Sequence, residues 1–361
     1  MNASERIGNL RAVLVADDLP ALVVSDPSNI RYLCGFTGSA GTLVVSASGS
    51  TALITDGRYQ EQARAEVDDS ASGSEAIQVI VSRNTPEALA EALGAERQIA
   101  VEADQISLAT AASLEGSEYR FELIATRGLV AGLRAVKDDD EIECLATAVA
   151  IADTSLAATL ADAGPEMTED EFGLALEVQM RRRGATGNSF APIVAAGPNA
   201  ALPHARPEHT PLGQRRPVVI DFGCRVDGYC SDTTRTVSFG EPEAEIAKIF
   251  DIVAEAQDAA RSAVRDGAEC VAVDAAARDV IADAGYGEHF VHATGHGIGL
   301  DVHEALRLSE SSADRLETGN VVTIEPGIYL PGKGGVRLED MVVVEPEGCR
   351  TLQTAPRRLA I

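Results

Sequence analysis

Short apolar runs and helical repeats alternate through residues 1–127 of the chain. Apolar side chains recur at helical spacing over residues 5–17, and residues 21–25 form an apolar run of strand length. Two further runs, 42–46 and 51–55, enclose a turn of small residues and predict a hairpin. The same reading predicts helices at 58–67, 85–95 and 107–114, and strands at 76–82, 99–102 and 119–125. The alternation therefore predicts a compact α/β domain.

Residues 29–41 (NIRYLCGFTGSAG) interrupt this pattern with small and turn-forming side chains. Their composition predicts a loop, with a lip over an active site as the functional alternative.

Glycines and a charged run over residues 126–140 predict a domain boundary, with the first domain taken as residues 1–127, and longer helical repeats follow. Helices are predicted at 141–161, 168–183, 243–264 and 271–284, and Thr168 and Glu171 have the spacing of a capping box. Strands are predicted at 192–195, 217–224, 229–237, 320–325 and 336–344. Helices and hairpins in this order predict an α+β second domain, residues 128–361, with a largely antiparallel sheet.

One predicted hairpin, residues 218–237, carries two acidic residues on the same face. Its turn is Asp227-Gly228, a dipeptide that favours two-residue hairpin loops. Residues whose numbers sum to 455 then pair, so that Asp221 faces Thr234 and Asp232 is a diagonal neighbour of Asp221. Asp221 follows an apolar run, and a buried carboxylate must be paired or bind a metal. The alternative is that both are surface acids, which are abundant in this chain.

The charge balance is strongly acidic, with 56 Asp and Glu against 30 Lys and Arg and a net charge of -26. Nucleic-acid binding is disfavoured because phosphate contacts need basic surface. Acids are scattered along the chain and lysine occurs at only three positions, from which we hypothesise a halophilic protein that needs high ionic strength. The alternative is an ordinary acidic protein.

No secretory signal and no apolar run long enough to cross a bilayer are evident, so a cytoplasmic protein without membrane contact is expected. The six cysteines form no CxxC pair and are expected to be free thiols.

Four of the six histidines lie between positions 289 and 303, in EHFVHATGHGIGLDVHE. Glycines flank His296 and allow close approach of a ligand, and imidazole is a common metal ligand. Glu325 ends the apolar run VVTIE, and Glu339 lies in VRLEDMVVV, where Arg337 shares its face. An ion pair with Arg337 is the alternative for Glu339.

Four carboxylates and one imidazole would together suit two divalent ions. The residues are Asp221, Asp232, His296, Glu325 and Glu339. Oxygen-rich ligation of this kind favours Mn²⁺, which we expect first, or Co²⁺, Fe²⁺ or Zn²⁺. Paired ions lower the pKa of a bridging water, which indicates hydrolytic chemistry.

The acid pair D-x10-D followed by TGHGIGLDVHE, TIEPG and RLED resembles the pita-bread metallopeptidases. That family includes methionine aminopeptidase, Xaa-Pro aminopeptidase and prolidase. The segments YLCGFTGSAG and ITDGRY resemble the creatinase/prolidase amino-terminal domain, which methionine aminopeptidases lack. The resemblance therefore implies the proline-specific branch, with an α/β N-terminal domain ahead of a pita-bread catalytic domain.

The resemblance also implies metal-binding roles. Asp221 would chelate one ion, Asp232 and Glu339 would bridge both ions, and His296 and Glu325 would hold the other. Glu325 would in addition take the proton from the attacking water.

The substrate-side roles come from the same resemblance. His303 would contact the substrate near the scissile carbonyl, and His204 would assist the tetrahedral intermediate. His292 would lie at the proline side of the site, and Arg337 would orient the residues around it.

The expected function is that of a two-metal exopeptidase that cleaves the Xaa-Pro bond of dipeptides or short peptides through a metal-bridging hydroxide. The alternatives are an aminopeptidase for longer Xaa-Pro peptides, a non-catalytic binding module, and a metal-free creatinase-type hydrolase. The resemblance implies a homodimer in which each N-terminal domain covers the partner's active site.

Overall fold

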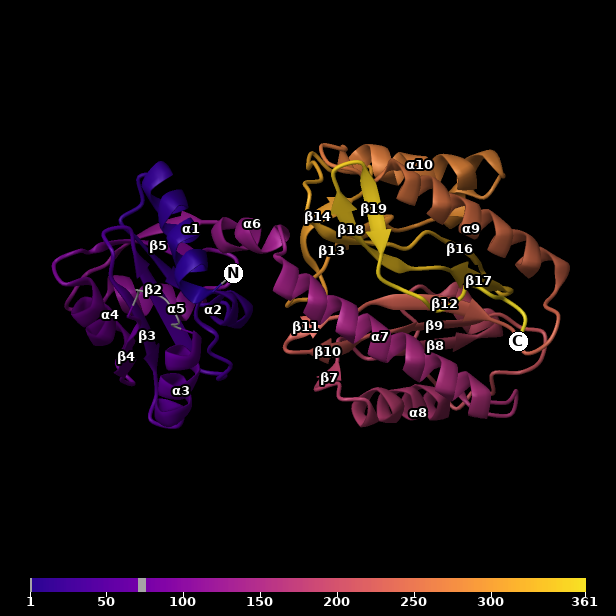
Figure 1. The fold of residues 1–361 in the computed structure, drawn as a ribbon, viewed down its shortest axis with the longest axis horizontal. Helices are drawn as coiled ribbons and strands as arrows, with labels where there is room; N and C mark the ends of the chain where they lie inside the picture. Colours follow the sequence, from indigo (N-terminus) through magenta and orange to yellow (C-terminus); the bar gives the residue numbers. More distant parts are fainter. Residues whose placement is uncertain (1, 71–75) are drawn as a thin grey trace. The chain divides into compact units, whose positions relative to one another are not determined.

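The computed structural model describes residues 2–70 and 76–361, which divide into two compact units, Met1–Arg134 and Ala135–Ile361 (Figure 1). Helix α6 (Leu129–Ala135) belongs almost wholly to the first unit. The carbonyl of Leu133 accepts a hydrogen bond from the Tyr32 hydroxyl, and Arg134 donates to Asn29 at 2.8 Å. The division thus falls after α6, within the segment 126–140 in which the sequence predicts a boundary.

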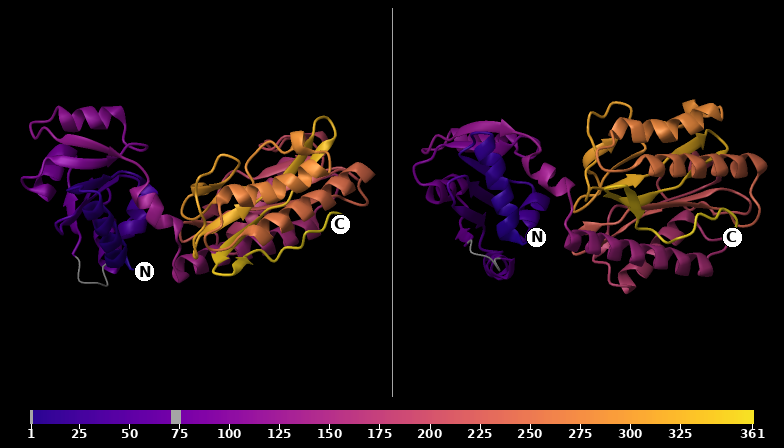
Figure 2. Two further views of the ribbon diagram at one scale, coloured as in Figure 1. Left: turned by 90° about the horizontal axis from the view of Figure 1, so that it is seen from above. Right: turned by 45° about the horizontal axis from the view of Figure 1, so that its top comes forward.

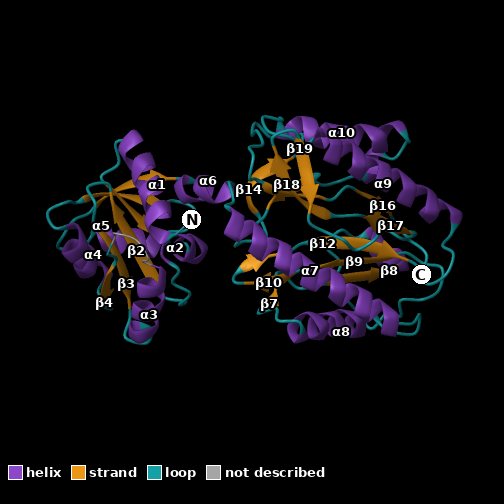
Figure 3. Ribbon diagram, in the orientation of Figure 1, coloured by secondary structure: helices purple, strands orange, loops and turns teal. Residues whose placement is uncertain are grey.

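The described part of the first unit contains a six-stranded sheet in the order β4-β3-β2-β1-β5-β6 (Figure 3). Strands β1, β2 and β3 pair antiparallel, while β4, β5 and β6 join in parallel. The strands are β1 (Ala21–Val24), β2 (Gly41–Ser46), β3 (Thr51–Thr55), β4 (Gln78–Val81), β5 (Gln98–Glu102) and β6 (Glu122–Thr126). The helices besides α6 are α1 (Ala3–Ala16), α2 (Pro27–Cys34), α3 (Gln60–Ser70), α4 (Thr85–Leu93) and α5 (Leu108–Glu115).

Helix α2 corrects the expectation of a loop over residues 29–41. The side chain of Asp26 accepts a hydrogen bond from the N–H of Asn29 at 2.8 Å, and Pro27 occupies the first helical turn, where proline is tolerated. The helix ends at Gly35, whose φ of 76° is in the left-handed region. Asp26 and Pro27, which start this helix, precede residues 29–41, so the composition of that segment does not reveal the helix. Only the residues after Gly35 form a loop.

The second unit is built from two pairs of helices that cover twisted sheets, and its helices follow the sequence pattern closely. They are α7 (Asp139–Asp162), α8 (Glu169–Arg182), α9 (Ala244–Ala263) and α10 (Cys270–Asp283), with short 3-10 turns η1 (Gly197–Ala201) and η2 (Gly287–His289). The predicted capping box at the start of α8 is confirmed, because Thr168 and Glu171 exchange both hydrogen bonds.

The strands of this unit form short antiparallel sheets in the orders β12-β9-β8, β11-β10-β7, β14-β13-β15-β18-β19 and β16-β17. The first two contain β7 (Gly187–Asn188), β8 (Ile193–Ala196), β9 (Val218–Phe222), β10 (Cys224–Val226), β11 (Tyr229–Cys230) and β12 (Thr233–Val237). The others contain β13 (Gly295–Gly297), β14 (Glu304–Leu308), β15 (Val321–Ile324), β16 (Gly327–Leu330), β17 (Gly334–Arg337), β18 (Asp340–Glu345) and β19 (Gly348–Thr351). Strands β7, β13, β14, β16 and β19 were not predicted.

Two hydrophobic clusters hold the second unit together. One joins α7 and α8 to β8 and β9, and the other joins α9 and α10 to β15–β18. Figures 1 and 2 show each helix pair on the outside of its sheet. A third, smaller cluster contains Ala195 of β8 and Val219 of β9 with Ala200 and Ala205.

By length and composition, one described helix, α7, is apolar enough to cross a membrane. The sequence predicted no apolar segment long enough to cross a membrane, and α7 is an exception to that prediction. Its buried residues Ala148, Ala152 and Leu156 pack with α8 and the β9 sheet in one cluster. The apolar composition is therefore used in a protein core.

The predicted hairpin register over 218–237 is confirmed. Asp221 pairs with Thr234, and Arg225 with Cys230. Asp227 and Gly228 form the turn with φ of 46° and 80°, as a mirror-image hairpin turn requires.

Gly223 interrupts the hairpin and separates β9 from β10. A Cβ atom at Gly223 would lie 1.8 Å from the carbonyl oxygen of Ser231, so only glycine allows this close approach. The opposite strand breaks at the same level, which leaves Asp232 between β11 and β12 and outside the regular ladder.

Candidate active site

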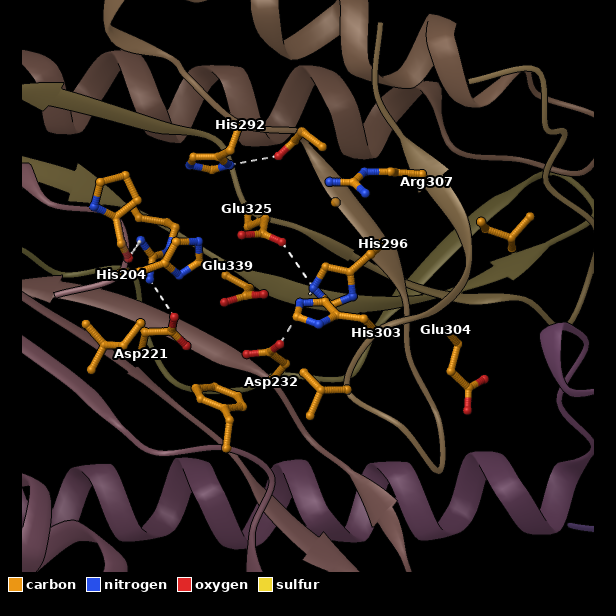
Figure 4. A pocket seen from close by; sticks show the side chains of 18 of the residues that line it. His204, Asp221, Asp232, His292, His296, His303, Glu304, Arg307, Glu325 and Glu339 are labelled. Carbon is orange, nitrogen blue, oxygen red and sulfur yellow. Dashed lines mark hydrogen bonds and ion pairs between the residues drawn. The ribbon is translucent and has the colours of Figure 1, made fainter. Parts of the chain in front are cut away.

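A cavity of about 1040 Å³ lies in the second unit and is lined by residues of β8, β9, β13, β14 and β17 and of the loops between strands. Figure 4 shows Asp221, Asp232, His296, Glu325 and Glu339 pointing toward one another within it. These are the five residues that the sequence selected as metal ligands, and the structure brings all of them together. The remaining predicted site residues, His204, His292, His303 and Arg337, line the same cavity.

Asp221, the next-to-last residue of β9, points into the cavity. Its Oδ2 accepts a hydrogen bond from Nη2 of Arg337 at 2.5 Å. Its Oδ1 is buried and has no hydrogen-bond partner among the described residues. Burial raises the pKa of Asp221, and the charge of Arg337 opposes that rise. A buried carboxylate oxygen that is unpaired and faces other carboxylates is suited to bind a cation.

Asp232, His296 and Glu339 offer ligand atoms that all lie within 4.8 Å of one another. Burial, followed by the charge of Glu339, holds the pKa of Asp232 well above its ordinary value. Burial and the charges of Glu325 and Asp221 do the same for the pKa of Glu339. Without a positive charge among them, these carboxylates repel one another in a setting that screens charge weakly.

His296 and Glu325 form the opposite side of the cluster. Nε2 of His296 lies 3.3 Å from Oε1 of Glu325 and 3.8 Å from Oδ2 of Asp232, while Nδ1 is 3.0 Å from the carbonyl oxygen of Gly297. Burial would raise the pKa of Glu325, but the hydrogen bond and charge of His296 lower it to about 2. With Nδ1 engaged by a backbone carbonyl, Nε2 is the nitrogen that faces the carboxylates.

Glu339 does not form an ion pair with Arg337, which was the alternative to metal binding for this residue. Its Oε2 accepts a hydrogen bond from the Thr234 hydroxyl at 2.7 Å, and its N–H donates to the carbonyl of Thr234 at 3.1 Å. The guanidinium of Arg337 instead donates to Asp221, to the hydroxyls of Thr234 and Tyr329, and to a backbone carbonyl.

Asp232 lies outside the ladder, and two side chains hold its backbone in place. Its N–H points to Sδ of Met341 at 3.3 Å, and its carbonyl accepts a hydrogen bond from Nε2 of Gln353 at 2.9 Å. Gln353 also accepts a hydrogen bond from the N–H of Met341 at 2.7 Å. The segment after β19 thus fixes the position of a carboxylate in the cluster.

The residues fit a pair of divalent ions. Four carboxylates would neutralise two such ions, one oxygen of Asp221 has no partner among the described residues, and one imidazole nitrogen faces inward. Oxygen-rich sites of this kind select hard or borderline cations rather than soft ones.

The other three cavity histidines differ in how they are held. Nε2 of His292 lies 2.8 Å from the Tyr329 hydroxyl, and its Nδ1 lies 2.8 Å from the carbonyl oxygen of Ala293. The ring of His303 stands edge-on to that of His296, with 4.4 Å between centroids. Burial lowers the pKa of both His292 and His303, which favours their neutral forms. His204 is exposed and lies on the cavity wall.

Two residues of the site were missed from the sequence, of which Arg307 lines the cavity and Tyr329 lies buried behind it. Tyr329 shares its hydroxyl between His292 and Arg337, at 2.8 and 2.9 Å. Arg307 is exposed and lines the cavity, and its side chain forms no hydrogen bond or ion pair with another described residue. It pairs with His296 across β13 and β14, two strands that the pattern did not predict.

Comparison with known proteins identifies the family of the chain. Metallopeptidase family M24 matches residues 143–346, and the creatinase/prolidase N-terminal domain matches residues 6–136. The Xaa-Pro dipeptidase of Pyrococcus furiosus is 30% identical over 359 residues, which cover 98% of this chain and 99% of that protein.

Solved structures resemble the chain along its length. Xaa-Pro dipeptidase from Bacillus anthracis has a TM-score of 0.93 at 38% identity, with 100% of both chains covered. X-Pro aminopeptidase from Thermotoga maritima MSB8 has a TM-score of 0.87 at 34% identity, covering 95% of this chain and 98% of that one. The second unit has the pita-bread fold, and the chain belongs to metallopeptidase family M24, with a creatinase/prolidase domain at its N-terminal side.

Proposed function

We propose that this metallopeptidase is an exopeptidase that cleaves the peptide bond between a first residue and proline. The observation that carries the proposal is the convergence of Asp221, Asp232, His296, Glu325 and Glu339 on one cavity. Relatives along nearly the whole chain that are named Xaa-Pro dipeptidase or X-Pro aminopeptidase support the choice of substrate class.

Two divalent ions bound by these five residues would supply Lewis acidity, which lowers the pKa of a water molecule and polarises the scissile carbonyl. Glu325 lines the same cavity, where its carboxylate can accept a proton from the attacking water. His303 and His204 lie on the cavity wall, where they can donate hydrogen bonds to the carbonyl oxygen as charge develops on it. His292 would sit beside the proline ring, with its orientation set by Tyr329.

Arg307 favours a dipeptide over a longer substrate. Its guanidinium forms no ion pair with a described residue, in a chain whose net charge is -26. A dipeptide presents a free carboxylate one residue beyond the scissile bond, and arginine binds carboxylates through two parallel hydrogen bonds. A longer Xaa-Pro peptide has a neutral amide at that position and would gain less from Arg307.

The test compares hydrolysis of Xaa-Pro with that of Xaa-Pro-Yaa by wild-type protein and by Arg307→Gln. A dipeptidase should prefer Xaa-Pro, and Arg307→Gln should raise KM for Xaa-Pro about tenfold or more while changing that for Xaa-Pro-Yaa little. Preference of wild type for the tripeptide would favour the aminopeptidase alternative. A metal-loaded protein that cleaves neither peptide would favour a binding module on the same fold.

We propose manganese as the ion on the basis of the donor set, with Co²⁺, Zn²⁺ and Fe²⁺ as alternatives.

The family resemblance supports a homodimer, and light scattering measures the oligomeric state. A cytoplasmic location and a requirement for high salt remain proposals that rest on sequence composition. The unpaired Asp221 oxygen and the complete ligand set argue against the metal-free creatinase-type alternative.

A further inference from the structure

One buried carboxylate holds both ends of the segment that carries His204. Glu169, the first residue of α8, is 0% exposed. Its Oε1 accepts hydrogen bonds from the N–H of Ala196 at 2.7 Å and from Nδ2 of Asn199 at 3.0 Å. Its Oε2 accepts a hydrogen bond from the N–H of Glu208 at 3.0 Å. These donors lie on either side of His204 in the chain.

Hydrogen-bond donors, rather than a cation, balance the charge of Glu169. Its carboxylate forms no ion pair with another described residue, and its place in the first turn of α8 puts it at the positive end of the helix dipole. A buried carboxylate is stable only while such donors remain in place. Because the donors come from both ends of one segment, the carboxylate fixes the geometry of that segment.

The His204 ring has no anchor of its own. It forms no hydrogen bond with another described residue, and its side chain is exposed on the cavity wall. The preceding residue, Pro203, is fixed because its carbonyl accepts a hydrogen bond from Nη1 of Arg337 at 3.2 Å. The place of the imidazole therefore depends on the backbone of the segment and on whatever holds that backbone.

We infer that Glu169 is a positioning residue for His204, acting through the backbone of residues 196–208 and without contact with substrate. The inference rests on the proposed function, in which His204 stabilises charge on the scissile carbonyl. A displacement of about 1 Å in such a group can lower the rate as much as a hundredfold.

The test substitutes Glu169→Gln, which keeps the shape of the side chain but turns one acceptor into an NH₂ group facing a backbone N–H. We expect kcat for Xaa-Pro hydrolysis to fall about tenfold or more, with bound metal unchanged. Glu171→Gln is the matched control, because it removes one negative charge from the same helical turn at an exposed site. It should leave kcat unchanged.

A double-mutant cycle with His204→Ala separates positioning from general damage. If Glu169 acts through His204, Glu169→Gln should change kcat by less than about twofold once His204 is absent. An equal loss in both backgrounds, or wild-type kcat for Glu169→Gln, would overturn the inference. Wild-type kcat for His204→Ala alone would contradict the proposed role of His204 and, with it, the inference.

Asn199→Ala provides a second variant if Glu169→Gln does not fold. It removes a donor to both Glu169 oxygens, at 3.0 and 3.4 Å, and leaves no misplaced polar group. In the same cycle it should lower kcat less than Glu169→Gln and again lose its effect when His204 is absent. Equal losses in both backgrounds would overturn the inference here too.

Discussion

Individual carboxylates in the cavity are in an environment that opposes their charge. Asp221, Asp232 and Glu339 are buried, and each has another carboxylate as a neighbour. Arg337 is the cation that contacts Asp221 directly, and it also donates to Tyr329 and Thr234. One guanidinium cannot neutralise four carboxylates, so the cluster gains most of its stability when divalent cations bind.

Replacement of a single ligand should therefore empty a metal position without unfolding the chain. We expect Asp221→Asn and His296→Ala each to lose at least one bound ion and to lower kcat at least about a hundredfold. His209→Ala is the control, because that side chain is 93% exposed and pairs only with Asp170 among the described contacts. Metal analysis and peptide hydrolysis measure both effects. Full turnover by either ligand variant would contradict the assignment.

The metal-free protein should lose stability as the pH rises toward neutrality. Burial and neighbouring carboxylates raise the pKa of Asp232 and of Glu339 above their ordinary values of 3.8 and 4.5. Between the ordinary and the raised pKa, the folded chain binds more protons than the unfolded chain, so the free energy of unfolding falls with increasing pH. The pKa of Glu325 is lowered to about 2, so its titration affects the free energy of unfolding only at lower pH.

Thermal unfolding of metal-stripped protein between about pH 5 and about pH 8 measures this slope. In the variant Asp232→Asn/Glu339→Gln the slope should become shallower, because those two groups no longer titrate. Saturating manganese should also reduce it in wild type. An unchanged slope in the double variant would show that other groups cause the loss.

The five proposed metal ligands could be predicted from the sequence because each lies in or next to an apolar strand, or in a glycine-rich segment that cannot form a long helix. Arg307 was missed because the side chain reaches the cavity only through pairing of β13 with β14. That pairing shifts register between His296 and Gly297, and periodicity does not reveal such an irregularity.

Among the elements, the loop that carries His303 is tied to the start of the second unit by a buried ion pair. Nζ of Lys137 lies 2.9 Å from Oε2 of Glu304, with side-chain exposures of 1% and 5%. The N–H of Lys137 also donates to the carbonyl of Gly319. The pair therefore links the strand after His303 to the residues that follow α6.

Loss of this cation should be costly, because it removes a buried ion pair of Glu304. We expect Lys137→Met to lower the free energy of unfolding by about 3–5 kcal/mol. Lys333→Met is the matched control, since Lys333 pairs with Glu245 on the exposed surface, where ion pairs contribute little. Urea unfolding of both variants gives the comparison. Equal effects of the two substitutions would contradict the account of the buried pair.

The long helices were predictable because their apolar stripes repeat over several turns and their caps are local signals, as at Thr168. Short strands were not. Strand β7 has 2 residues and β13 has 3, of which two are glycine, so neither carries a repeating pattern. Their conformation is set by partners distant in sequence, which local propensity does not contain.

At the scale of the whole molecule, the sequence pattern and the structure both divide the chain into an α/β unit and an α+β unit. The exact position of the division within the predicted boundary segment follows from α6, which is anchored to Tyr32 and Asn29 by contacts that no local pattern encodes. The pita-bread fold was identified from the order of four motifs, since the arrangement of several short sheets is beyond the reach of periodicity.

The net charge of -26 is a property of the whole chain, and it predicts a dependence of stability on salt. Repulsion among unpaired surface acids is screened when the Debye length shrinks from about 10 Å at 0.1 M salt to about 3 Å at 1 M. We expect the thermal unfolding midpoint to rise as KCl increases over this range, with activity rising in parallel. Equal stability and activity in dilute buffer would contradict a halophilic protein.

The proposed function depends above all on five side chains that together bind two cations. Crystals of the protein soaked in manganese, measured for anomalous scattering at the manganese edge, test this directly. The prediction is two anomalous peaks about 3.5–4 Å apart, both within bonding distance of Asp221, Asp232, His296, Glu325 or Glu339. The absence of peaks among these side chains, with the side chains turned away from one another, would contradict it.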